Sequence, residues 1–114
     1  MKGTIFATLA VLAGPVLGAG GAFAQQPGNA AAGERLAVAV CANCHLVREG
    51  QPQSPMDSVP SFAAVANDPG MSESRLRGFL NRPHFPMPSI DLSRQQIDDL
   101  IAYIHSRRGG APAR

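Results

Sequence analysis

The chain has 114 residues, enough for one domain, and 45% of them are hydrophobic, although only 5% are aromatic and tryptophan is absent. The formal net charge is only +2 at pH 7, which does not favour binding to nucleic acid or to an anionic membrane surface. A core with so few large side chains is marginal by itself. We therefore expect a bound group to contribute apolar surface to the fold.

The first 24 residues have the layout of a cleaved secretory signal. Lys2 supplies a positive charge, residues 5–17 are apolar, and residues 22–24 form a small-x-small site. We predict cleavage after Ala24, which leaves residues 25–114 as one domain exported across the inner membrane to the periplasm. If the segment is not cleaved it would be a membrane anchor, for which it is barely long enough.

The remaining sequence predicts helices and contains no alternating pattern typical of a strand. Polar residues at helix starts and apolar residues at helical spacing mark each segment. Asn29 can cap the first helix, Ser72 the third, and Ser93 forms a capping box with Gln96 at the start of the last. Helices are predicted over residues 30–40, 62–66, 73–80 and 94–107, separated by proline-rich loops at 48–59 and 81–91.

Cys41, Cys44 and His45 form a C-x-x-C-H run at the end of the first predicted helix. Residues three apart on a helix point to one side, so each thiol can add to one of the two vinyl groups of a haem. The histidine that follows directly would then lie beneath the iron as an axial ligand. This spacing predicts one covalently attached haem c.

The same cysteines could instead form a redox disulfide or bind zinc. A redox disulfide of the thioredoxin type needs a preceding strand, whereas the surroundings here are helical. A structural zinc site needs four ligands, but the chain has no third cysteine, and His84 and His105 are far apart in the sequence. An export signal agrees with haem, because bacteria attach haem covalently outside the cytoplasm.

With these residues in place, the chain resembles the class I cytochromes c, which are small monohaem electron carriers. The resemblance rests on residues 41–45, 59–62, 86–88 and 100–104 and covers nearly all of the predicted mature domain. It implies an all-α cytochrome c fold in which the N-terminal and C-terminal helices cross around one covalently bound haem.

The resemblance also assigns Gly33 the role of letting the first helix approach the last closely, near Tyr103. The family usually has an aromatic residue four positions after this glycine, where this chain has Ala37. We therefore expect a looser crossing, with Leu36 or Val40 filling the gap.

The second axial ligand is predicted to be Met87. It stands between Pro86 and Pro88, which hold the backbone extended and present the thioether rigidly, and His/Met ligation is a recognised haem arrangement. The resemblance likewise places Met87 opposite the axial histidine, and it implies that the carbonyl of Pro60 accepts a hydrogen bond from the ring of His45. His84, in the same loop as Met87, is the rival ligand.

Together these features predict a periplasmic one-electron carrier. No nucleophile, paired-carboxylate site or oxyanion arrangement points to an enzyme. We expect a monomer that exchanges electrons with partner proteins, does not bind nucleic acid, and contacts a membrane only if the leader is retained. Two alternatives are a dedicated haem subunit or partner of a periplasmic dehydrogenase or other oxidoreductase, and a gas-binding protein with an open sixth position.

Overall fold

The computed structural model describes residues 26–52, 56–82 and 84–110, so the predicted leader lies outside the described residues. Those residues form helices joined by loops and contain no strand, which confirms the predicted all-α class. None of the described helices is both long and apolar enough to cross a membrane. The elements are α1 (Ala30–Leu36), a π-helical turn η1 (Ala37–Cys41), α2 (Phe62–Asn67), α3 (Glu73–Asn81) and α4 (Arg94–Ser106).

Each α-helix begins at a polar side chain that caps it. The side-chain oxygens of Asn29, Ser61, Ser72 and Ser93 accept hydrogen bonds from backbone N–H groups in the first turns of α1, α2, α3 and α4. At α4 the side chain of Gln96 also accepts from the backbone N–H of Ser93, at 2.8 Å, and completes the predicted capping box. These caps explain why helix starts were predictable from the sequence.

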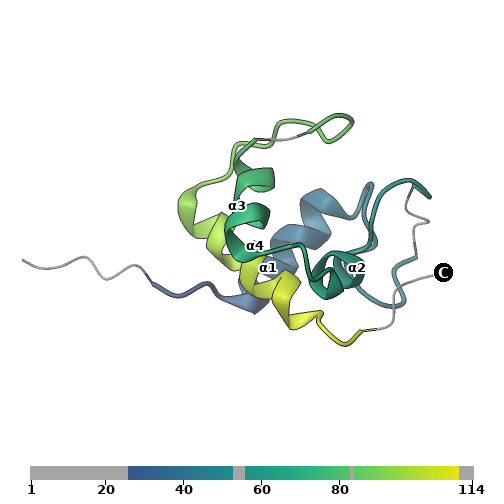
Figure 1. The fold of residues 1–114 in the computed structure, drawn as a ribbon, viewed down its shortest axis with the longest axis horizontal. Helices are drawn as coiled ribbons and strands as arrows, with labels where there is room; N and C mark the ends of the chain where they lie inside the picture. The colour runs from purple at the N-terminus through teal and green to yellow at the C-terminus, as the bar shows by residue number, and fades with distance from the viewer. Residues whose placement is uncertain (1–25, 53–55, 83, 111–114) are drawn as a thin grey trace, which may run out of the picture.

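The N-terminal and C-terminal helices, α1 and α4, cross at close range (Figure 1). A Cβ atom at Gly33 would lie 2.8 Å from the Cβ of Tyr103 and nearer still to the carbonyl of Asp99, so only glycine fits there. The predicted role of Gly33 is therefore confirmed. Ala37, where a looser crossing was expected, is completely buried in η1, and Leu36 and Val40, which were expected to fill the gap, pack against the core while remaining partly exposed.

The first predicted helix does not continue as an α-helix to residue 40. It changes after Leu36 into the π-helical turn, whose wider hydrogen bonding is seen where the N–H of Ala42 reaches the carbonyl of Ala37 at 3.0 Å. Such single turns are common at functional sites, because they add one residue and change which side chains face inward. Here the turn ends at Cys41, which is buried.

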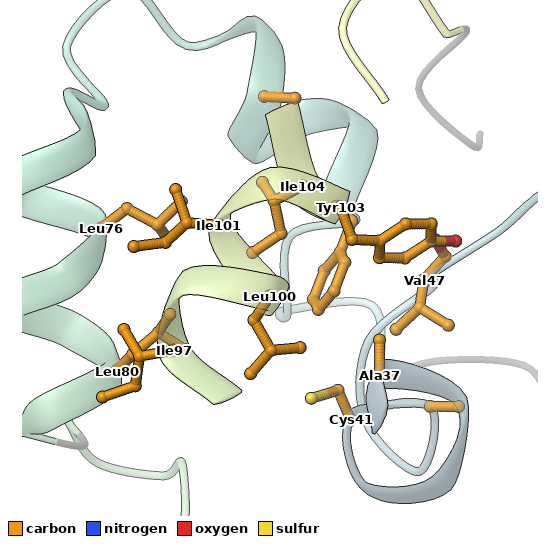
Figure 2. Packing of buried hydrophobic residues seen from close by; sticks show 13 residues of the cluster. Ala37, Cys41, Val47, Leu76, Leu80, Ile97, Leu100, Ile101, Tyr103 and Ile104 are labelled. Carbon is orange, nitrogen blue, oxygen red and sulfur yellow. The ribbon is translucent and has the colours of Figure 1, made fainter. Parts of the chain in front are cut away.

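The buried apolar residues form one cluster, to which η1, α2, α3 and α4 all contribute. Figure 2 shows Leu76 and Leu80 of α3 facing Ile97 and Ile101 of α4, with Leu100 deeper between α4 and the end of the first helical segment. On the other side of α4, the buried hydroxyl of Tyr103 donates to the carbonyl of Val47 at 2.9 Å. This bond ties the loop that follows the C-x-x-C-H run to the C-terminal helix.

Candidate haem-binding site

A cleft with two lobes opens between η1, the loop before α2 and the loop between α3 and α4. The lobes have volumes of about 320 Å³ and 230 Å³, and together they are in the size range of cofactor sites, roughly 300–1,000 Å³. Five residues line both lobes: Cys41, His45, Pro60, His84 and Met87. The structure thus brings the two sequence-predicted axial ligands to one cleft, although they are distant in the chain.

A hydrogen bond holds the ring of His45 in place. Its Nδ1 atom lies 2.7 Å from the carbonyl oxygen of Pro60, the partner that the family resemblance implied. Because a carbonyl oxygen can only accept a hydrogen bond, Nδ1 carries the proton, and the neutral ring keeps a free electron pair on Nε2. A bond of this kind fixes the tautomer and makes the imidazole a stronger electron donor to a metal. The ring of Phe62 packs beside it, with centroids 5.5 Å apart.

The two cysteines are free thiols on the wall of the larger lobe. Cys41 is buried and Cys44 is half-buried. Burial raises the pKa of the Cys41 thiol to about 11, so this thiol is protonated at neutral pH.

Met87 is half-buried, packs against the core and lines both lobes. Its backbone N–H donates to the carbonyl of His84 at 2.6 Å, so the two candidate ligands sit on one tight turn. The ring of His84 is exposed and packs edge-on against Phe79 at 5.0 Å. Of the other methionines, Met56 lines only the larger lobe and is 52% exposed, while Met71 lines only the smaller one.

The described residues that line the two lobes include no aspartate, glutamate or arginine. Most of them are apolar, and the smaller lobe is walled by Phe62, Leu76 and Leu80 among others. A flat porphyrin needs such a dry lining, with nitrogen and sulfur ligands at its centre. The donor set of one imidazole, one thioether and two thiols therefore fits a covalently bound haem.

Comparison with known proteins supports the same class. Residues 28–104 match the family described as cytochrome c oxidase, cbb3-type, subunit III, and the chain therefore belongs to this family of c-type cytochromes. Membership implies a covalently bound haem c with its iron and a role as an electron carrier that exchanges electrons with partner proteins.

Among individual proteins, the chain is similar to cytochrome c-552 of Bradyrhizobium diazoefficiens. The two are 48% identical over 80 residues, which are 70% of this chain and 76% of that relative. No solved structure gave a significant match.

Two structural roles, one at the site and one at the contact with α4, have no signal in the sequence. Gln51 lies in a proline-rich loop that the sequence marks only as irregular, yet its side chain binds the backbone on both sides of His45. Gly28 precedes the first cap, and a Cβ there would lie 3.1 Å from the Cβ of Ala102 and closer to the carbonyl of Asp98. Both roles depend on contacts that only the folded chain creates.

Proposed function

We propose that this protein is a periplasmic one-electron carrier with a six-coordinate haem. Cys41 and Cys44 would hold the haem through two thioether bonds, and the imidazole of His45 and the thioether of Met87 would bind its iron. The bound haem supplies the redox chemistry, since its iron accepts and returns one electron. The observation that carries the proposal is that all four residues line one apolar cleft, with the Nε2 electron pair of His45 left free by the bond to Pro60.

The chain's own residues keep the surroundings of the iron constant. The Pro60 carbonyl would hold the proton on Nδ1 of His45, and the apolar walls would keep water from the iron. Two large apolar side chains at the larger lobe, Met56 and Phe85, are exposed by 52% and 97%. Exposed apolar side chains next to the cleft support electron exchange with partner proteins at this face.

The test of the ligand set is carbon monoxide added to the reduced protein. We expect the wild type to bind it slowly and weakly, because Met87 occupies the sixth position, and Met87→Ala to bind it rapidly. Met56→Ala is the matched control and should behave as the wild type does. Rapid, tight binding by the wild type would instead identify an open-site, gas-binding protein. The absorption of the oxidised protein in the near infrared distinguishes Met87 from His84, because only sulfur ligation gives a thioether-to-iron band.

Export is tested separately. The mass of the mature protein should correspond to a chain that starts at Gln25 and carries one haem, and the protein should be recovered in the periplasmic fraction. A chain that keeps residues 1–24 and sediments with membranes would show that the leader serves as an anchor.

A second candidate function is suggested by the family description, which names an oxidase subunit. In that version the protein is the dedicated haem subunit of a larger oxidoreductase and not a free monomer. Sedimentation of the protein purified from its own cells separates the two: a free carrier sediments as a single chain of about 10 kDa with its haem, whereas a subunit sediments in a stable complex.

A further inference from the structure

Residues 41–47 form the haem-attachment segment, and Gln51 makes more hydrogen bonds to it than any other side chain among the described residues. Its Oε1 accepts from the backbone N–H of Val47, and its Nε2 donates to the carbonyls of Ala42 and His45, each at 3.0 Å. The orientation of the amide is determined by its partners, because only the oxygen can accept from an N–H and only the nitrogen can donate to two carbonyls.

These three bonds close the attachment segment into a fixed shape. One bond joins Gln51 to Ala42, which lies between the two cysteines. The other two join it to His45 and to Val47, two positions further along the chain. Within the segment, the N–H groups of Cys44 and His45 both donate to the carbonyl of Cys41, at 3.1 Å and 2.9 Å. The turn from Cys41 to His45 is thus already tight, and Gln51 keeps Ala42 and Val47, on either side of His45, from separating.

The other anchors of this segment bind it only after His45. The hydroxyl of Tyr103 binds the carbonyl of Val47, and the N–H of Phe62 binds the carbonyl of Leu46 at 2.9 Å. Neither reaches the residues between Cys41 and His45. The backbone that carries the His45 ring is therefore held by Gln51, while the ring itself is held by Pro60.

We propose that Gln51 is a positioning residue for the axial histidine and thereby tunes the reduction potential. This inference rests on the proposed function, in which His45 ligates the iron. With Gln51 in place, the backbone of His45 stays where its ring can keep the 2.7 Å bond to Pro60. Without it the bond loosens and the imidazole donates less strongly. A weaker donor stabilises ferric iron less, so the potential rises.

Asn67 provides a matched control for the test. Its side-chain amide also makes three hydrogen bonds to backbone groups, donating to the carbonyls of Ala63 and Gly110 and accepting from the N–H of Gly109. One of these bonds lies within α2, the other two join α2 to the chain after α4, and none touches the attachment segment. Gln51→Ala and Asn67→Ala therefore remove equivalent sets of bonds, and only the first set lies beside His45.

The experiment compares the wild type, Gln51→Ala and Asn67→Ala as purified haem proteins. Urea unfolding, the reduction potential and the proton resonances of the haem methyl groups in the oxidised state are measured for each. We expect both variants to unfold at lower urea concentration than the wild type. Only Gln51→Ala should raise the potential and change the methyl shifts, which depend on the orientation of the axial imidazole.

Unchanged potential and methyl shifts in Gln51→Ala, or equal changes in Asn67→Ala, would overturn the proposal. If Gln51→Ala does not accumulate, the uncharged variant Gln51→Met is measured in its place, since it keeps the length of the side chain and loses all three hydrogen bonds; the same rise is expected and its absence is equally decisive. A wild-type protein without covalent haem would refute the proposed function instead, so the two failures are distinguishable.

Discussion

Gly33 shows how one missing side chain sets the distance between two helices. The position faces the backbone of α4 at Asp99, which cannot move aside as a flexible side chain could. We predict that Gly33→Ala lowers the free energy of unfolding by about 1–3 kcal/mol, because overpacking at a closed contact outweighs the gain in helix propensity. Denaturant unfolding of the haem protein measures the change.

Gly78 is the control for this prediction, because it lies in α3, is exposed, and has no atom within 4 Å of the place that a Cβ would occupy. Gly78→Ala should raise stability by about 0.5–1 kcal/mol through helix propensity alone. If Gly33→Ala and Gly78→Ala changed the free energy of unfolding equally, α1 and α4 would not lie as close at Gly33 as the contacts described above require.

Because of Tyr103, the free energy of unfolding should decrease at alkaline pH. Burial, and then the negative charge of Glu34, raise the pKa of its hydroxyl, while Arg107 and Arg48 oppose this to a lesser degree. The folded protein thus retains the phenol proton at a pH where the unfolded chain has released it. The resulting stability is complete below the usual tyrosine pKa of about 10 and is lost as the pH rises through the higher pKa of the folded state.

We therefore predict that the free energy of unfolding of the wild type falls above pH 10, and that Tyr103→Phe flattens this fall. The variant should also lose about 1 kcal/mol near neutral pH, because the carbonyl of buried Val47 loses its donor. Tyr103 is the only tyrosine in the sequence, so the absorbance of the phenolate reports its titration directly. A midpoint at or below 10 in the folded protein would contradict the argument.

At the scale of elements, α3 is joined to α4 by charge as well as by apolar packing. The guanidinium of Arg77 contacts Asp98 of α4 at 2.6 Å and Glu73, one turn earlier in α3, at 3.1 Å. The carboxylate of Asp98 is only 18% exposed, so this ion pair is less screened than one at the open surface. It holds α3 in register where Leu76 and Leu80 meet α4.

Replacing Arg77 by methionine should lower the free energy of unfolding by about 0.5–1.5 kcal/mol at low ionic strength, and by less in 1 M salt. Arg75→Met is the control on the same helix. Arg75 has no carboxylate within 4 Å among the described residues and lies over the ring of Phe79, 5.9 Å from its centroid. A loss for Arg77→Met that is independent of salt would assign the effect to packing and not to charge.

The elements that the sequence predicts well are those whose starts depend on local chemistry. Asn29, Ser72 and Ser93 cap helices through bonds to residues within one turn, so the sequence alone contains both partners. The π-helical turn after Leu36 has no such local signal. It arises where the chain must close against α4 and also direct Cys41 toward the cleft, and both demands come from the tertiary structure.

The same division applies to the site. The C-x-x-C-H run marks the attachment segment because covalent haem chemistry requires a fixed spacing, and Met87 stands out through its flanking prolines. The spacing of these residues alone does not bring them to one cleft with Pro60; the family resemblance implied that grouping, and the fold produces it. Gln51 could not be predicted, since a glutamine in a loop has no pattern until its three backbone partners are brought around it.

At the scale of the whole molecule, several residues belong both to the hydrophobic core and to the lining of the cleft. Cys41, Phe62, Leu76 and Leu80 are core residues that also line the cleft, so the haem would complete the packing of side chains from η1, α2 and α3. A group that binds only the folded chain stabilises it by mass action, and a covalent bond makes that contribution permanent. Folding and haem attachment should therefore be coupled in this protein.

We predict that the Cys41→Ser, Cys44→Ser double variant, prepared without haem, is poorly folded. The contact between α1 and α4 can persist in part, because Gly33 and Tyr103 do not line the cleft, whereas α3 and the loop that carries Met87 lose the surface on which they pack. Circular dichroism should show reduced helix content, and urea should unfold the variant without a sharp transition. Native helicity with a cooperative transition would show instead that the core of α3 and α4 is sufficient without the haem.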